Sequence, residues 1–201
     1  MKRIIFVVIS AVLFSCKDNV SKESNDSNEA DNSANKEIDT TADNPVSEEY
    51  SFLSEYPYKP VPFIDSTNFN NTKATKELTV QQRKLLHLDK ILGENYSDVI
   101  QSIQISYRVN LSDNFSTIVM SYELGEHELL TTLVNYDDNF KPIAWKEIAY
   151  DEIAEGLIRK HSKIYKDSIL VSKINYYEEV PDTTFTQLKI DKSGFIVNVD
   201  E

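Results

Sequence analysis

Histidine and cysteine side chains are frequent carriers of catalysis and metal binding, and in this chain they are few and scattered. The three histidines, His87, His127 and His161, show no pair with the spacing of a metal site or a metalloprotease motif. The single cysteine, Cys16, cannot form an internal disulfide, and a thiolate zinc site needs several cysteines. The sequence therefore predicts neither a metal site nor a disulfide framework.

Charge and glycine usage limit the possible ligands. The chain has 33 acidic and 21 basic residues and a net charge of −12, so dense polyanions such as nucleic acids are repelled. The four glycines stand after an expected helix, in expected turns or before an expected strand, at positions 93, 125, 156 and 194. None is left for a phosphate-binding loop, so we expect no nucleic-acid partner and no cofactor.

Carboxylates gather in the segment YDEIAEG, residues 150–156. Asp151 can cap a single helical turn, with Ile153 and Ala154 packed under a sheet, which makes the segment a connector between strands. Alternatively, Asp151 and Glu155 could hold Ca²⁺ or act as an acid/base pair.

A second candidate is the segment IRKHSKI, residues 158–164. If it is a strand, Arg159, His161 and Lys163 share one face and Ile158 and Ile164 share the other. The three basic side chains are then either a solvated sheet face or a docking strip for an anionic group.

Aromatic residues and prolines crowd residues 50–63, with five aromatics and three prolines in fourteen positions. The prolines exclude a helix or a central strand, which predicts an extended segment whose rings pack on the domain. Aromatic clusters also stack on sugars, so Tyr56 and Tyr58 are candidate binding residues for a glycan or peptide. A proline-rich ligand for a partner protein is a further interpretation.

The N-terminus has the pattern of a signal peptide. Lys2 and Arg3 precede eleven largely apolar residues at positions 4–14, a length typical of the apolar core of such a peptide. A membrane-spanning helix needs about 20 residues, so this run is too short to span.

The residues that end this apolar run are Leu13, Phe14, Ser15 and Cys16. They resemble the lipobox of bacterial lipoprotein precursors. The resemblance implies cleavage between Ser15 and Cys16, a diacylglyceryl thioether on the Cys16 sulfur and usually a third acyl chain on its amine. Two or three acyl chains anchor a protein stably in a membrane. An ordinary secreted protein with an isolated thiol is the alternative.

The following Lys17 and Asp18 resemble the signals that route lipoproteins of Bacteroidetes-type bacteria to the outward face of the outer membrane. Residues 17–49 hold ten acidic residues, three lysines and no aromatic residue, which predicts a disordered tether. The sequence thus predicts a signal peptide at 1–15, a lipidated cysteine with an acidic tether at 16–49, and one globular domain at 50–201.

Hydrophobic periodicity predicts the elements of that domain. Thr79 and Gln82 form a capping box before an apolar stripe that includes Leu85, Leu88 and Ile91, and Gly93 ends the helix. From about residue 99 apolar and polar residues alternate, in short runs separated by turn signals. Over residues 103–111 the apolar positions alternate with Gln104, Ser106, Arg108 and Asn110, and residues 118–124 follow the same pattern. Each of these runs is expected to be a strand with one apolar and one solvated face. The expected fold is α+β and mainly β, a curved antiparallel meander of seven or eight strands with one amphipathic helix packed against it.

Residues 78–199 also resemble a group of uncharacterised lipoproteins from Bacteroidetes-type bacteria, in the stretch ELLTTLVNYDDNFKPIAWKEIAYDEIAEGLIRKHSKI. The resemblance implies a mainly β domain and no known activity. The predicted function is a lipid-anchored, non-enzymatic binding or accessory module of the cell envelope. Its partners are the membrane, through the lipid, and an envelope protein, peptide or glycan. A hydrolase of envelope or extracellular polymers using Asp151 and Glu155, or an inhibitor or immunity-type module, remain alternatives.

Overall fold

The computed structural model describes residues 48–73 and 75–199. All described residues belong to one compact unit of the chain. The predictions for the signal peptide, for cleavage between Ser15 and Cys16, for lipidation of Cys16 and for most of the tether lie outside the described residues.

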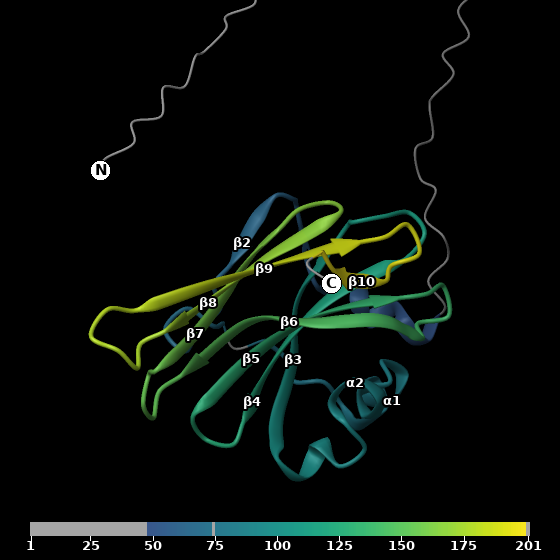
Figure 1. Cartoon of the computed structure of the whole chain (residues 1–201). Coiled ribbons are helices and arrows are strands. Elements are labelled where there is room, and N and C mark those ends of the chain that lie inside the picture. Colours follow the sequence, from purple (N-terminus) through teal and green to yellow (C-terminus); the bar gives the residue numbers. More distant parts are fainter. Residues whose placement is uncertain (1–47, 74, 200–201) are drawn as a thin grey trace, which may run out of the picture. The chain divides into compact units, whose positions relative to one another are not determined.

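One open, curved sheet dominates the described residues, which confirms the predicted α+β, mainly β class (Figure 1). Its strands are β1 (Tyr58–Lys59), β2 (Phe63–Asp65), β3 (Ile100–Val109), β4 (Ser116–Leu124), β5 (Glu128–Tyr136), β6 (Pro142–Glu152), β7 (Ile158–Ile164), β8 (Ser168–Asn175), β9 (Asp182–Ile190) and β10 (Ile196–Asn198). From β3 to β10 each strand pairs antiparallel with the next, as predicted for the meander. The two short strands β1 and β2 were not predicted; β1 pairs parallel with β3 and β2 antiparallel with β7.

The sheet has a hydrophobic cluster on each side of β3, β4 and β5. The helix-side cluster includes Ile105, Met120 and Val134, together with residues of the helices. The strand-side cluster includes Val119 and Leu133, together with residues of β7, β8 and β9. Because β4 is buried along both faces, the prediction that it has one solvated face is wrong: the sheet curves so that its later strands cover that face.

A β-bulge divides β3 between the two clusters. The register with β4 shifts between Ile105 and Tyr107, so the alternation of faces changes there. Ile103 and Ile105 lie in the helix-side cluster, whereas Tyr107 and Val109 lie in the strand-side cluster. The predicted single apolar face over residues 103–111 is therefore wrong.

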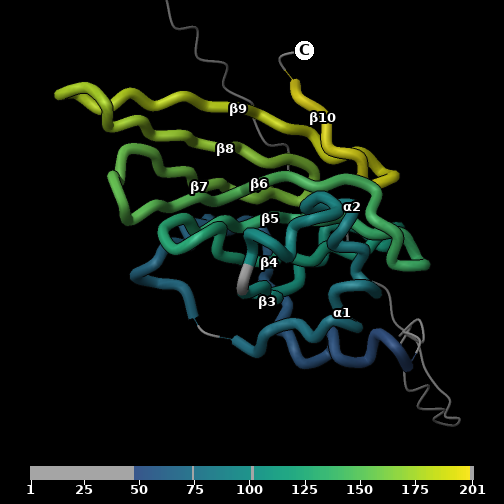
Figure 2. Tube along the Cα trace, turned by 90° about the horizontal axis from the view of Figure 1, so that it is seen from below, coloured from purple at the N-terminus to yellow at the C-terminus, as the bar shows by residue number. Residues whose placement is uncertain are grey.

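The predicted helix is present as two shorter ones, α1 (Val80–Leu85) and α2 (Leu88–Leu92). The capping box of Thr79 and Gln82 is confirmed, with both reciprocal hydrogen bonds. The helix breaks at His87, whose left-handed backbone (φ 51°) reorients the chain and buries Leu86 and Leu88. Helix α1 lies on the side of β3 and β4 away from β8 and β9 (Figure 2), and Leu88 and Ile91 of α2 pack in the helix-side cluster.

Two 3₁₀ helices complete the described elements, η1 (Glu48–Glu55) and η2 (Tyr96–Asp98). The prediction that residues 50–63 are extended throughout is wrong for their first part, because η1 runs up to Glu55 before Pro57 intervenes. Extended backbone begins at Tyr58, where β1 pairs at the edge of the sheet. The packing of aromatic rings on the domain is confirmed for Tyr50, Phe52 and Tyr56.

Candidate ligand-binding pocket

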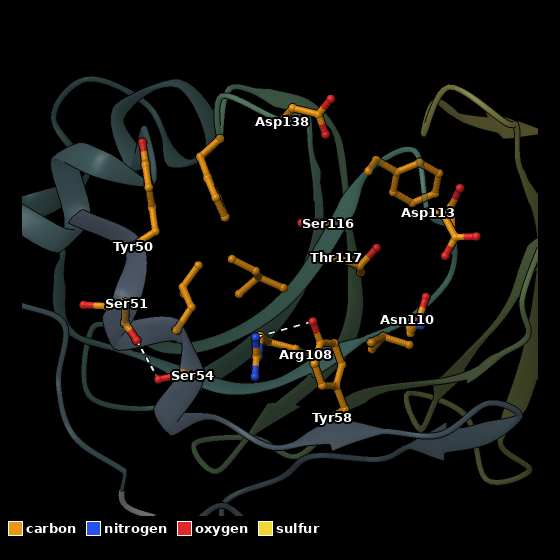
Figure 3. A pocket seen from close by; sticks show the side chains of 16 residues that line it. Tyr50, Ser51, Ser54, Tyr58, Arg108, Asn110, Asp113, Ser116, Thr117 and Asp138 are labelled. Carbon is orange, nitrogen blue, oxygen red and sulfur yellow. Dashed lines mark hydrogen bonds between the residues drawn. The ribbon is translucent and has the colours of Figure 1, made fainter. Parts of the chain in front are cut away.

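A cavity of about 400 Å³ opens between η1, the end of β3, the start of β4 and the β5–β6 turn (Figure 3). Its volume lies within the range of small-ligand sites. Aromatic and polar side chains line it together, among them Tyr50, Tyr58, Arg108, Asp113, Asp138 and Phe140. The cavity is therefore suited to a ligand that has both apolar and hydrogen-bonding groups.

One wall of the cavity is a pair of stacked rings. The ring of Tyr50 on η1 lies parallel to that of Phe140, with 4.0 Å between their centroids. Phe140 has a left-handed backbone (φ 54°) in the β5–β6 turn. Asp137 holds this turn, because its carboxylate accepts hydrogen bonds from the backbone N–H groups of Asn139 (2.9 Å) and Lys141 (2.8 Å). The turn thus fixes the aromatic wall and the adjacent Asp138.

Opposite this wall, Arg108 and Tyr58 form a rigid pair. The parallel pairing of β1 with β3 places Tyr58 beside Arg108, whose guanidinium carbon is 4.1 Å from the centre of the Tyr58 ring. Arg108 Nε donates to the carbonyl oxygen of Tyr56 at 3.1 Å, and Nη1 donates to Tyr58 Oη at 3.4 Å. Among the described residues no carboxylate forms an ion pair with Arg108. Its remaining N–H groups are therefore available to a ligand.

The rim of the cavity is polar. Asn110, Asp113, Ser116 and Asp138 are exposed, and none of their side chains has a hydrogen bond or ion pair with another described residue. Asp138 lies at the end of the cavity opposite Tyr58 (Figure 3). These groups can accept or donate hydrogen bonds to a polar ligand without first breaking bonds inside the protein.

Below the rim, a buried network holds the cavity floor. The hydroxyl of Thr117 donates to Asn135 Oδ1 at 2.8 Å, and Asn135 Nδ2 donates to the carbonyl oxygen of Gly194 at 2.8 Å. All three residues are buried. Gly194 has a left-handed backbone (φ 88°), and a Cβ there would lie 3.1 Å from Phe115 and Ile143. The β9–β10 turn is thereby fixed to the strands under the pocket.

Of the predicted binding residues, the structure brings Tyr58 into the pocket. Tyr58 is 61% exposed. Tyr56 is buried at 7% exposure and contributes its carbonyl oxygen, which orients Arg108. Sequence reasoning missed Arg108, which it placed only among the polar positions of an alternating strand. No local signal links residue 108 to residue 58, because their contact depends on the pairing of β1 with β3.

The basic residues of β7 lie elsewhere in the sheet. Arg159, His161 and Lys163 alternate with the buried Ser162 and Ile164, so they share a face of β7 as predicted. Arg159 Nε is 3.2 Å from Asp151 Oδ1, and Lys163 Nζ lies 5.1 Å from the centre of the Tyr165 ring. None of the three lines the pocket.

The predicted role of Asp151 as a helix cap is wrong. Asp151 lies near the end of β6, is 3% exposed and accepts a hydrogen bond from the backbone N–H of Phe69 at 3.1 Å. Ile153 and Ala154 are exposed instead of packed under the sheet, because β6 continues to Glu152 and then bends. Asp151 and Glu155 make no hydrogen bond with each other, and Glu155 is exposed. Through its hydrogen bond and its ion pair, Asp151 links the backbone at Phe69 and the side chain of Arg159 on β7 to β6.

A second carboxylate group surrounds Tyr150. Tyr150 Oη lies 2.7 Å from Glu128 Oε1 and 2.8 Å from Glu152 Oε2, and its single proton can be donated to one of them at a time. Burial and these two carboxylates raise the pKa of Tyr150 above its ordinary value. Hydrogen bonds from Tyr150 and from the backbone of Leu157 lower the pKa of Glu152. The phenol therefore stays protonated at neutral pH and fixes the end of β6 to β5.

Comparisons with protein-family models, with curated proteins and with solved structures find no match for this chain. In residues 48–73 and 75–199, no group of three or more His, Cys, Asp or Glu residues is arranged so that it could hold a metal ion. None of the helices in these residues has the length and apolar character needed to cross a bilayer.

Proposed function

We propose that the chain is a lipid-anchored protein of the bacterial cell envelope, and that its globular domain is a non-enzymatic module that binds a saccharide in the pocket beside Tyr58. The observation that carries the binding proposal is the Tyr58 ring, which is 61% exposed yet held in place by Arg108. An exposed ring that is already fixed loses little conformational entropy when a ligand stacks on it.

A saccharide suits the chemistry of this pocket. A sugar ring has an apolar C–H face that can pack on an aromatic ring, while its hydroxyls need hydrogen-bond donors and acceptors. Tyr58 offers the ring, Arg108 offers directed N–H donors, and Asp113, Asp138 and Asn110 offer acceptors. The alternative hydrolase that uses Asp151 and Glu155 is less well supported, because Asp151 is buried and already bound to Arg159 and Phe69.

The anchoring proposal rests on the sequence: Lys2, Arg3, the apolar run that follows them, and Ser15 before Cys16. Two or three acyl chains on Cys16 hold a protein in a membrane. The acidic residues 17–49 would act as a tether that lets the domain bind ligands away from the membrane surface. We expect the full chain, expressed in a Gram-negative host, to fractionate with membranes and to carry acyl mass on an N-terminal Cys16. The Cys16→Ala variant should lose both properties. Wild-type protein whose intact mass shows Cys16 without acyl chains would contradict the proposal.

For the binding proposal we expect Tyr58→Ala to weaken saccharide binding about ten- to a hundredfold, the effect of losing one stacked ring and the support of Arg108. The measurement is calorimetric titration with a panel of soluble neutral and carboxylated tetrasaccharides. Tyr177→Ala is a matched control, because Tyr177 is similarly exposed at 63% and does not line the pocket. Equal losses in the two variants, or no binding of any saccharide by the wild-type domain, would refute the pocket as a saccharide site.

A further inference from the structure

A second cavity, of about 620 Å³, lies beside the first, and both are lined by Tyr58. Its lining comes from residues 55–60, Thr67, residues 71–73, Thr75, Lys76, Ser106 and Tyr107. We infer that the two cavities are consecutive subsites of one groove, and that the groove takes an oligosaccharide in which a carboxylated sugar follows a neutral one. This inference rests on the proposed saccharide site and adds the chemical class of its ligand.

The second cavity is basic although the chain as a whole is acidic. Three lysines line it, Lys59, Lys73 and Lys76, against one carboxylate, that of Glu55. None of these lysines forms an ion pair with a carboxylate of the described residues. Because charges farther apart than about 8 Å are screened at physiological ionic strength, the local lysines outweigh the net charge of −12 for a sparsely charged ligand.

Lys59 is the best-positioned of these cations. Its Nζ lies 4.3 Å from the centre of the Phe63 ring and 4.5 Å from that of Tyr107. The two rings hold the ammonium group without neutralising its charge. Lys59 follows Tyr58 directly in β1, and both residues line the second cavity.

The segment that carries the other two lysines is attached to β3. The side chain of Gln104 accepts hydrogen bonds from the backbone N–H (2.8 Å) and hydroxyl (2.9 Å) of Thr75 and donates to the carbonyl oxygen of Lys73 (3.2 Å). Lys73 and Lys76 are exposed, so their ammonium groups remain free to meet a ligand. Both lysines therefore place positive charge on the wall of the groove.

The two cavities differ in charge, and this difference sets the orientation of the ligand along the groove. The rim of the first cavity carries Asp113 and Asp138. These carboxylates disfavour an anionic group there and accept hydrogen bonds from the hydroxyls of a neutral sugar. Arg108 also lines the first cavity but offsets only one of these two carboxylates, whereas the lysines of the second cavity outnumber its one carboxylate. The carboxylated sugar consequently belongs beside Lys59.

The test uses the tetrasaccharide panel in matched pairs, in which both members have the same linkage and one carries a carboxylate on a single sugar. We expect the carboxylated member of the best-binding pair to bind at least tenfold more tightly, and Lys59→Gln to remove most of this preference. The double variant Lys73→Gln/Lys76→Gln should reduce it further. Lys90→Gln is the control, because it changes the net charge equally at an exposed site on α2 that lines neither cavity.

The outcomes separate this inference from the proposed function. Tyr58-dependent binding that is equal for both members of every pair would overturn the inference and leave the saccharide site standing. A carboxylate preference that persists in both lysine variants would also overturn it. Failure of every saccharide to bind would overturn both proposals. Near-ultraviolet circular dichroism of each variant shows whether the fold is retained, and the exposed Lys73 and Lys76 provide a variant that leaves the packed ring contacts of Lys59 intact.

Discussion

Replacing Asn135 by leucine is expected to lower the free energy of unfolding by about 3 kcal/mol, because it leaves two buried polar groups without partners. Asn135 is fully buried, accepts from Thr117 and donates to the carbonyl oxygen of Gly194. Each orphaned group costs about 1–3 kcal/mol, and leucine can make neither bond. The measurement is urea unfolding followed by circular dichroism.

A double-mutant cycle identifies the cause of this loss. Thr117→Val alone orphans Asn135 Oδ1, whereas Thr117→Val together with Asn135→Leu leaves only the Gly194 carbonyl unsatisfied. We therefore expect the double variant to be less destabilised than the sum of the single variants, by about 1 kcal/mol. Strict additivity would argue against a coupled network.

An exposed bond of the same kind gives the control. Asn114 Nδ2 donates to the carbonyl oxygen of Lys192 at 3.2 Å in an exposed position. Water can replace that bond, so Asn114→Leu should change stability by about 0.5 kcal/mol or less. A loss at Asn114 as large as that at Asn135 would show that burial is not the cause.

The difference between local and distant interactions explains which features the sequence could predict. All eight strands of the meander were predicted, because their alternation and turn residues are local signals. The bulge at residues 105–107 was not, because it depends on the pairing of β3 with β4 and leaves the alternation of residue types unchanged. The break at His87 was missed for a related reason: burial of Leu86 and Leu88 against the sheet outweighs the continuity of one helix.

The pocket was predictable only in part. The aromatic and proline-rich segment was a visible signal, and it contains Tyr58 and Tyr50. Arg108 carried no such signal, since a single arginine on an alternating strand is ordinary and its role depends on a two-residue parallel pairing. The basic residues Arg159, His161 and Lys163 gave a stronger local pattern but lie outside both cavities. Local patterns therefore identified residues that could bind, and only the pairing of β1 showed which of them meet.

A second large effect is expected at alkaline pH, where buried tyrosines oppose the folded state. Tyr107, Tyr122 and Tyr136 are each 8% exposed or less, and burial raises the pKa of all three phenols above the ordinary value of about 10. For Tyr107, the neighbouring Asp65 raises the pKa further, because it accepts the phenolic hydrogen and its charge opposes that of a phenolate.

The sign of the effect follows from which state binds protons. Above pH about 10 the unfolded chain loses these phenolic protons while the folded chain keeps them, so the folded state becomes less favourable as pH rises. The stability that the neutral phenols provide is complete below pH about 10. Each group then costs about 1.4 kcal/mol per pH unit, or about 4 kcal/mol per unit for the three together.

With a typical domain stability of about 5–15 kcal/mol, the domain should unfold within a few pH units above 10. We expect the ultraviolet absorbance of tyrosinate to rise in two stages, the second of which accompanies the loss of near-ultraviolet circular dichroism as the buried phenols ionise on unfolding. Tyr136→Phe removes one of the buried phenols and should reduce the pH dependence of stability by about 1.4 kcal/mol per pH unit. Ionisation of all tyrosines in a single stage while the dichroism persists would show that these phenols do not resist ionisation, and that alkaline unfolding has another cause.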